Sequence, residues 1–223
     1  TQPCLRMVLA GLLLLAGCNT SGVSGGGGAL GGGSATVVYR ADQTIDTVEE
    51  LFAVSSGARI NPQLVLPKTV QAFAITPDSL SVVYIADQDA ATLFELYRVN
   101  LASPGTSVKL SSASVTGGKD VLDFKLIPDG SGVVYLADQD NDGVNELYKV
   151  LFSSPGTTTK LNGSLVSGGN VIEFDITANS GSVVYRADQD IDTVVELYRT
   201  ILSGGSNSKL HSAYAAEIGR AHV

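Results

Sequence analysis

The chain has 223 residues, 44% of them apolar, which is enough for one or two domains with a real core. Its formal net charge at pH 7 is −8, and an acidic surface without a basic patch repels phosphate groups, so the composition argues against nucleic-acid binding. The only two cysteines, Cys4 and Cys18, lie among the first 18 residues, which excludes a disulfide framework or a cysteine-rich metal site in the rest of the chain.

Residues 1–17 predict an export signal. Arg6 supplies a positive charge, and the apolar run from Met7 to Ala16 has the length of a signal-peptide core and about half the length of a membrane-spanning helix. The run ends in Leu15-Ala16-Gly17-Cys18, which resembles the lipobox of bacterial lipoproteins. This resemblance implies cleavage before Cys18 and a lipid on its thiol, which would anchor the protein to a membrane. The alternative is an ordinary secretory signal with an incidental cysteine.

Residues 18–34 follow the expected cleavage site and are rich in glycine and serine. Such a segment cannot pack a core, and we expect a flexible tether whose ends lie about 20 to 25 Å apart. Asn19 stands after the predicted lipidated cysteine in place of the aspartate that marks inner-membrane retention in the enteric sorting rule. The outer membrane is therefore the expected location.

A repeat begins after the tether. Four tyrosines are spaced by 45, 51 and 50 residues, and each precedes a second aromatic residue by 13 positions. The pairs are Tyr39 with Phe52, Tyr84 with Tyr97, Tyr135 with Tyr148, and Tyr185 with Tyr198. A period of about 50 residues is typical of a solenoid or a propeller.

Within each repeat, short runs of β-branched and aromatic residues alternate with turn signals, which predicts four antiparallel strands. The strands expected in the second repeat are Val70–Ile75, Ser81–Ala86, Phe94–Leu101 and Ser107–Leu110. Those of the third are Val121–Ile127, Gly132–Ala137, Glu146–Phe152 and Thr158–Leu161, and those of the fourth are Val171–Ile176, Ser182–Ala187, Glu196–Leu202 and Ser208–Leu210. The first repeat opens on Thr36–Ala41 and is expected to supply three strands. The second strand is apolar at nearly every position, so it needs cover on both faces, as in a sheet stacked between other sheets.

The third repeat also resembles a known family. Its motifs Pro128-Asp129-Gly130-Ser131, Val133-Val134-Tyr135, Asp138 and Glu146-Leu147-Tyr148 are similar to the repeat of TolB-like β-propellers, and the resemblance covers residues 36–210. We therefore predict an all-β fold, a β-propeller of four-stranded antiparallel blades over residues 35–216, with about three and a half to four blades present. TolB-like propellers have six blades, and residues 217–223 resemble a translated sequencing adapter. We expect a truncated propeller followed by a non-native tail.

The acidic loop of the third repeat is the candidate metal site. Asp138, Asp140, Asp142 and Glu146 alternate along a tight turn with Gly143 at the sixth position, a pattern that gathers oxygen ligands around calcium. The fourth repeat holds a weaker version with Asp188, Asp190, Asp192 and Glu196. The remaining copies retain Asp42, Asp46 and Glu50, and Asp87, Asp89 and Glu95. The alternative is that these aspartates close hairpins through side-chain-to-backbone hydrogen bonds, which aspartate does without a metal.

The sequence offers little for catalysis. Paired carboxylates recur in every repeat, which favours a structural role, and we expect no enzyme activity within this segment. The resemblance implies a cell-envelope lipoprotein whose propeller binds other envelope proteins. Two alternatives stay open. One is the N-terminal propeller of a prolyl-oligopeptidase-like serine hydrolase whose catalytic domain is missing. The other is a calcium-stabilised surface adhesion domain.

Overall fold

The computed structural model describes residues 37–112, 120–205 and 207–211. The predicted signal, the tether with Cys18 and the predicted non-native tail lie outside these residues. The described residues form strands and no helix, so none of them builds a helix that could cross a membrane.

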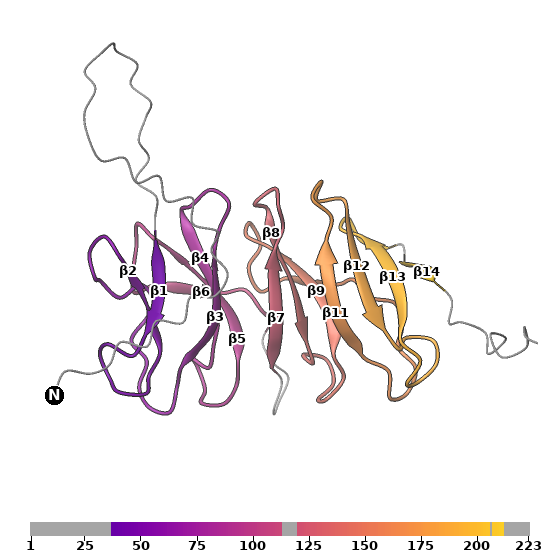
Figure 1. Cartoon of the computed structure of the whole chain (residues 1–223), viewed down its shortest axis with the longest axis horizontal. Coiled ribbons are helices and arrows are strands. Elements are labelled where there is room, and N and C mark those ends of the chain that lie inside the picture. Colours follow the sequence, from indigo (N-terminus) through magenta and orange to yellow (C-terminus); the bar gives the residue numbers. More distant parts are fainter. Residues whose placement is uncertain (1–36, 113–119, 206, 212–223) are drawn as a thin grey trace, which may run out of the picture.

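The strands form four antiparallel sheets, which we call blades 1 to 4 in chain order. Figure 1 shows the blades side by side in the order of the sequence. Blade 1 contains β1 (Val38–Ala41) and β2 (Glu50–Ala53), and blade 2 contains β3 (Val70–Ile75), β4 (Ser81–Ala86), β5 (Glu95–Asn100) and β6 (Ser107–Lys109). Blade 3 contains β7 (Val121–Leu126), β8 (Gly132–Ala137), β9 (Glu146–Leu151) and β10 (Thr158–Lys160). Blade 4 contains β11 (Val171–Ile176), β12 (Ser182–Ala187), β13 (Glu196–Ile201) and β14 (Asn207–His211).

The predicted four-stranded blades are confirmed for the second, third and fourth repeats, in which each strand pairs with the next one along the chain. The first repeat differs from the prediction, because the part of it that is described holds two strands and a single bridge between Phe52 and Arg59. The expected third strand does not continue beyond this bridge. The Asn61 side chain accepts a hydrogen bond from the Leu51 N–H at 2.7 Å, and the following Pro62 has no N–H with which to extend a ladder.

The turn between the first two strands of a blade is retained where the sequence departs from Pro-Asp-Gly. Asp129 accepts a hydrogen bond from the Ser131 N–H at 2.8 Å, and Asn179, which replaces it in blade 4, accepts one from the Gly181 N–H at 3.1 Å. Gly130 has a φ of 77°, and Ser180 takes its place with a φ of 55°. The side-chain acceptor therefore keeps the turn even where glycine is missing.

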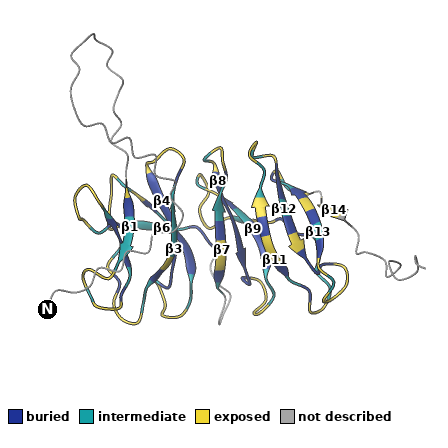
Figure 2. Ribbon diagram, in the orientation of Figure 1, coloured by how far each residue is buried: buried dark blue, intermediate teal, exposed yellow. Residues whose placement is uncertain are grey.

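The core lies between the blades. The aromatic pairs that mark the repeat stack across neighbouring strands, with ring centroids 5.4 to 5.7 Å apart, and in blades 2 to 4 they face the preceding blade. The aliphatic residues between them, such as Val83 and Ile85, face the following blade. Every residue of β4 and β8 is buried, which confirms that the second strand is covered on both sides, whereas β12 is partly exposed (Figure 2).

Candidate functional site

The candidate site is the acidic hairpin between β8 and β9. Asp138 follows β8 and is buried, and its two carboxylate oxygens accept hydrogen bonds from the Asp120 N–H at 2.6 Å and the Gly143 N–H at 3.0 Å. The bond from the Gly143 N–H closes the hairpin, and the bond from the Asp120 N–H joins the hairpin to the residue before β7. Asp138 thus satisfies two backbone donors that would otherwise be left without a partner.

Asp140 and Glu146 contact a lysine from the outermost strand. The Lys160 ammonium lies 2.8 Å from the Asp140 carboxylate and 2.7 Å from the Glu146 carboxylate. The Tyr148 hydroxyl donates a hydrogen bond to Glu146 at 3.0 Å, and the Lys160 nitrogen lies 5.9 Å from the centroid of the Tyr148 ring. The Glu146 side chain is 7% exposed, so the lysine and the hydroxyl together compensate a carboxylate that has lost most of its water.

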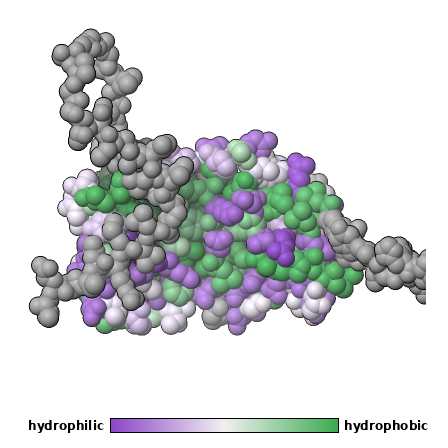
Figure 3. All heavy atoms as spheres, viewed as in Figure 1, coloured by the Kyte–Doolittle hydropathy of each residue, from purple (hydrophilic) through white to green (hydrophobic). Residues whose placement is uncertain are grey.

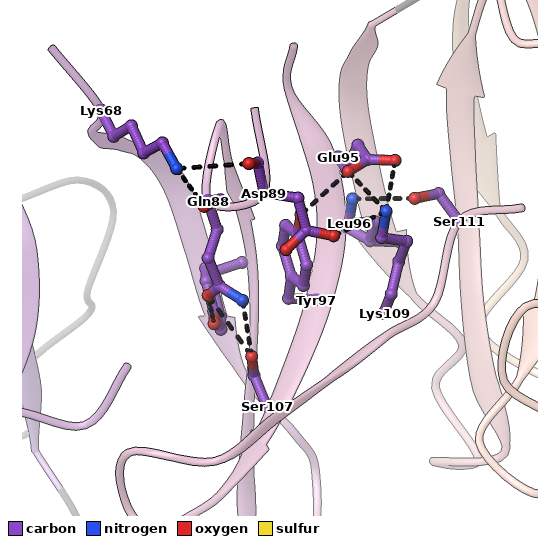
Figure 4. Close-up of polar contacts among 10 residues, drawn as sticks. Lys68, Gln88, Asp89, Glu95, Leu96, Tyr97, Ser107, Lys109 and Ser111 are labelled. Atoms are coloured by element: carbon purple, nitrogen blue, oxygen red, sulfur yellow. Dashed lines mark hydrogen bonds and ion pairs between the residues drawn. The ribbon is translucent and has the colours of Figure 1, made fainter. Parts of the chain in front are cut away.

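The same cluster recurs in blades 2 and 4. In blade 2 the Lys109 ammonium lies 2.7 Å from both Asp89 and Glu95, and the Tyr97 hydroxyl donates to Glu95 at 2.9 Å (Figure 4). The members in blade 4 are Asp190, Glu196, Tyr198 and Lys209, with Lys209 at 3.0 Å from Asp190 and 2.5 Å from Glu196. We call this arrangement the Asp-Lys-Glu-Tyr cluster. Its recurrence indicates a structural part of the repeat and not a site unique to one blade.

Asp87 and Asp188 repeat the role of Asp138. Asp87 accepts hydrogen bonds from the Thr69 and Thr92 N–H groups at 2.6 and 3.0 Å, and Asp188 accepts them from Asn170 and Thr193 at 2.5 and 3.1 Å. The turn position has a positive φ in every copy, filled by glycine once and by threonine elsewhere. These residues are Thr47, Thr92, Gly143 and Thr193.

Blade 1 departs from the pattern. Glu50 is buried and accepts hydrogen bonds from the Leu64 N–H at 2.9 Å and from the Thr44 hydroxyl, with Arg59 at 3.6 Å in the place of the lysine. Asp42 and Asp46 are exposed. Phe52 replaces the tyrosine, so this glutamate receives no hydroxyl from the aromatic pair.

The ligands expected for calcium do not converge. Asp138 points to backbone donors, Asp140 and Glu146 hold Lys160, and Asp142 is exposed. Among the described residues, no group of three or more histidine, cysteine, aspartate or glutamate side chains is arranged to hold a metal ion. A calcium ion between Asp140 and Glu146 would have to displace the lysine, so this arrangement does not fit the ion, and calcium binding at either hairpin stays a prediction.

Burial and charge shift the pKa values of the cluster. Burial lowers the pKa of the Lys160 ammonium, but the hydrogen bonds to Asp140 and Glu146 outweigh this effect, so the net pKa is raised. Burial also raises the pKa of the Tyr148 hydroxyl, and the adjacent Glu146 raises it further. Outside the cluster, burial raises the pKa of Tyr185, whose ring stacks on Tyr198, to about 12. The cluster therefore keeps its lysine charged and its tyrosine neutral at neutral pH.

The lysines were not predicted as part of the site. A signal for them exists in the sequence, since a Lys-Leu pair closes each of the last three repeats, at Lys109, Lys160 and Lys209. Their spacings of 51 and 49 residues agree to within one residue with the corresponding tyrosine spacings of 51 and 50, and the register of the third and fourth strands sets each lysine opposite the second tyrosine.

Comparison with known proteins identifies the architecture. No protein-family model matches the chain, and no curated protein sequence matches it either. The fold is similar to a puromycin-hydrolysing peptidase from Mycobacterium tuberculosis, with a TM-score of 0.56 and 12% identity over 79% of this chain and 29% of that one. It is also similar to the tricorn protease, with a TM-score of 0.56 and 13% identity over 82% and 16% of the two chains. A prolyl endopeptidase gives a TM-score of 0.55 and 11% identity over 80% and 27%.

These similarities show a propeller fold. The chain spans less than a third of each of these solved structures. The predicted all-β propeller of four-stranded blades is confirmed, and the resemblance to TolB-like repeats in particular stays a prediction.

Proposed function

We propose that the blades form a non-catalytic, protein-binding module of a lipid-anchored bacterial envelope protein. The observation that supports this most directly is the recurrence of the Asp-Lys-Glu-Tyr cluster in blades 2 to 4, where it binds each blade's own strands together. The side chains of residues 37–112, 120–205 and 207–210 include neither histidine nor cysteine, so this part of the chain offers no imidazole base and no thiol nucleophile. Propellers commonly bind through their loops, and the TolB-like repeat motifs favour a protein partner.

The lipid anchor is tested through Cys18. In a bacterial host fed a fatty acid that carries a chemical tag, we expect the wild-type chain to take up the tag and to sediment with the outer membrane. The Cys18→Ser variant should lose both the tag and the membrane association, while Cys4→Ser should retain them. Equal labelling of wild type and Cys18→Ser would contradict the anchor.

The protein-binding role is tested in the same cells with a photo-crosslinking amino acid. We place it in the exposed loops between the second and third strands, at Asn141 and at Ile191, and as a control in the exposed turn after β9, at Ser153. A partner bound by the hairpin loops should form one defined adduct from the first two positions and none from the control. Absence of adducts at all three positions in cells that contain the folded protein would argue against the module.

A second function is favoured by the structural similarities. The similar structures are peptidases, among them a prolyl endopeptidase, and the chain matches 16 to 29% of their length. We propose as the alternative that the blades are the gating propeller of a prolyl-oligopeptidase-like serine peptidase. The catalytic domain of such a peptidase would contain a G-x-S-x-G motif between a strand and a helix.

The source DNA distinguishes the two proposals. It should be read through and beyond the codons for residues 217–223. An open reading frame that continues into a G-x-S-x-G segment with an α/β-hydrolase pattern would establish the peptidase. A frame that continues into further repeats and then stops, or that stops without a hydrolase segment, would support the binding module.

A further inference from the structure

The junction between blades 2 and 3 contains a groove beside the fourth strand of blade 2. Its volume of about 350 Å³ is within the range of small-molecule sites. One wall consists of residues from β5, from β6 and from the turn between them, and the other consists of Phe152 and Pro155, which follow β9. The Gly156 N–H donates a hydrogen bond to the Leu110 carbonyl at 3.2 Å and so joins the two blades beside the groove. Both blades have a neighbour on each side, so the groove does not lie at an end of the array (Figure 1).

The groove is distinguished by its charge more than by its hydropathy. Hydrophobic and hydrophilic residues are interspersed over the face of the array drawn in Figure 3, so hydropathy alone singles out no site on that face. The described residues that line the groove are apolar or uncharged except for Arg98, and none of them is acidic. In a chain with a net charge of −8, a groove whose only charge is positive favours an anion that has an apolar part.

The Arg98 guanidinium keeps its hydrogen-bond donors available. Its central carbon lies 4.4 Å from the centroid of the Phe152 ring, and this cation–π contact occupies none of the five N–H groups. Arg98 donates no hydrogen bond to, and forms no ion pair with, any residue that the structure describes. Its charge acts on the Asp78 carboxylate, but that carboxylate already accepts hydrogen bonds from the Thr76 hydroxyl at 2.5 Å and the Leu80 N–H at 3.0 Å. The half-buried guanidinium therefore lacks the bound anion that is usual for such a group.

The equivalent cation of blade 3 has a partner inside the protein. Lys149 occupies the position of Arg98 and donates to the Leu202 carbonyl at 2.5 Å, and Leu202 stands where the groove has Phe152. In blade 1 this position is Ala53. An arginine over an aromatic ring is therefore a departure from the repeat at one junction, and the shared architecture of the blades does not require it.

A second donor lies in the same groove. The Asn100 carboxamide oxygen accepts a hydrogen bond from the Ala102 N–H at 2.8 Å, whereas its NH2 group donates to none of the residues described. Asn100 follows Arg98 by two positions in β5, so both side chains lie on one face of the strand. A guanidinium binds the two oxygens of a carboxylate as a fork, and the amide adds a further donor. A single arginine also matches the single charge of a carboxylate better than the double charge of a phosphate.

We propose that this groove binds the C-terminal carboxylate of a peptide whose last side chain is apolar. A C-terminal residue carries both groups on one carbon atom, so it can place its carboxylate against Arg98 and Asn100 and its side chain against Val108 and Pro155. Capture of a peptide carboxylate by fixed donors is a known mode of peptide recognition. The acidic hairpin of blade 2 precedes the first residue of β5, whereas Asn100 is the last, so this site is separate from the hairpin loops and does not rest on the function proposed for them.

The test is a titration of the full chain carrying Cys18→Ser, which removes the predicted lipidation. The isotope-labelled protein is titrated with acetyl-alanyl-leucine, which has a free carboxylate, and with the C-terminal amide of the same dipeptide. We expect saturable shifts in the NMR signals of the Arg98 Nε–H and the Asn100 NH2 group. The amide should bind at least about tenfold more weakly, because it lacks the charge that the guanidinium recognises.

Two pairs of matched variants locate the site. Arg98→Met removes the guanidinium, and Lys149→Met is its control at the equivalent position of blade 3. Val108→Asp sets a carboxylate opposite Arg98 in the strand register, where it competes with the peptide, and Thr159→Asp is its control. Val108 and Thr159 are both exposed, so these changes leave the core closed. Arg98→Met and Val108→Asp should each weaken binding at least about tenfold, and the controls should leave it unchanged. Thermal unfolding verifies that each variant is folded.

Three results would overturn the proposal. The first is the absence of saturable shifts at the groove in the folded protein. The second is equal binding of the acid and the amide, or equal weakening by a variant and its control, since either indicates adsorption without recognition of the carboxylate. The third is binding of hexanoate or inorganic phosphate as tight as that of the dipeptide, since this indicates a site for a fatty acid or for anions in general. None of these results bears on the hairpin loops, which the crosslinking experiment tests separately.

Discussion

Asp138 shows how one carboxylate organises a hairpin. It accepts two backbone N–H groups, one from its own turn and one from the residue before β7, and the equivalents Asp87 and Asp188 do the same in their blades. A buried acceptor of this kind is costly to remove, because the donors it satisfies lose their partner. The repeated aspartate is thus explained without a metal.

Replacement of Asp138 measures this role. Asp138→Ala should lower the free energy of unfolding by about 1 to 3 kcal/mol, because two N–H groups lose their acceptor. Asp138→Asn keeps one oxygen and should cost less. Urea denaturation provides the measurement, and exposed Asp142→Ala, the control, should stay within about 0.5 kcal/mol of wild type. A loss from Asp142→Ala as large as that from Asp138→Ala would contradict the assignment.

The clusters also predict a loss of stability in alkali. The pKa values of the cluster lysines Lys109 and Lys160 are raised in the folded protein, and burial raises the pKa of Tyr185, which stacks on the cluster residue Tyr198, to about 12. In the unfolded chain, tyrosine and lysine titrate near about 10 and 10.4. A raised pKa contributes stability that is complete below the unfolded value and is lost as the pH rises through the folded value.

The urea midpoint should therefore change little between about pH 7 and pH 9 and should fall above about pH 10. Tyrosinate absorbance, followed in the same samples, should rise together with unfolding. If the buried tyrosines ionise at the pH of free tyrosine while the protein stays folded, the expected shifts are wrong.

At the scale of the element, one polar side chain in each of blades 1 to 3 accepts a hydrogen bond from the strand that carries the second aromatic residue of the pair. The Leu147 N–H donates to the Asn162 side chain at 2.7 Å and the Leu51 N–H to Asn61 at 2.7 Å, whereas the Leu96 N–H donates to the Ser111 hydroxyl at 3.2 Å. Different residue types therefore fill one role, since the position requires only a short side chain with an oxygen acceptor.

This equivalence predicts how Asn162 tolerates change. Asn162→Ser should cost less than about 1 kcal/mol, because blade 2 uses serine at this position, whereas Asn162→Leu should cost about 1 to 3 kcal/mol, because the buried Leu147 N–H loses its acceptor. Urea denaturation of both variants decides the matter. Equal losses would mean that shape, and not the hydrogen bond, determines the residue at this position.

Calcium is tested at the hairpin of blade 3. If Lys160 keeps its place between Asp140 and Glu146, addition of millimolar calcium should leave the melting temperature unchanged, and this is the result we expect from the geometry. A ligand that binds only the native state must raise the melting temperature. A rise that Asp142→Ala abolishes and that magnesium does not reproduce would establish the predicted site and restore the adhesion hypothesis.

At the scale of the whole molecule, stability comes from contacts between neighbouring blades, as in other repeat proteins. Leu147 and Leu197 occupy the same position in blades 3 and 4, yet Leu147 is fully buried between two blades and Leu197 is half-buried on the face of blade 4 that points away from blade 3. The position within the array, and not the residue type, determines how much each side chain contributes to the free energy of unfolding.

The two leucines give a matched pair of substitutions. Leu147→Ala should lower the free energy of unfolding by about 2 to 5 kcal/mol, as expected for a buried leucine, and Leu197→Ala by less than half of that amount. Both are measured by urea denaturation. Equal losses would contradict this difference in burial between the two leucines.

The sequence by itself determined the repeat, the strand order and most strand ends. Runs of β-branched and aromatic residues bounded by turn residues require only local chemistry, so β3, β4, β8, β11 and β12 begin and end as predicted. The fully apolar second strand also required cover on both sides, because apolar residues on either face of a sheet must leave water. Together these features are sufficient to predict stacked blades.

Only the tertiary structure showed which side chains contact the carboxylates of the acidic hairpins. A lysine from the fourth strand reaches the carboxylates of the hairpin 20 positions earlier in the chain, between Asp140 and Lys160, because strand pairing sets it beside Tyr148. It also decided that Leu147 is fully buried while its equivalent Leu197 is only half-buried. Residue type and spacing are identical at these positions, and only the presence of a neighbouring blade distinguishes them.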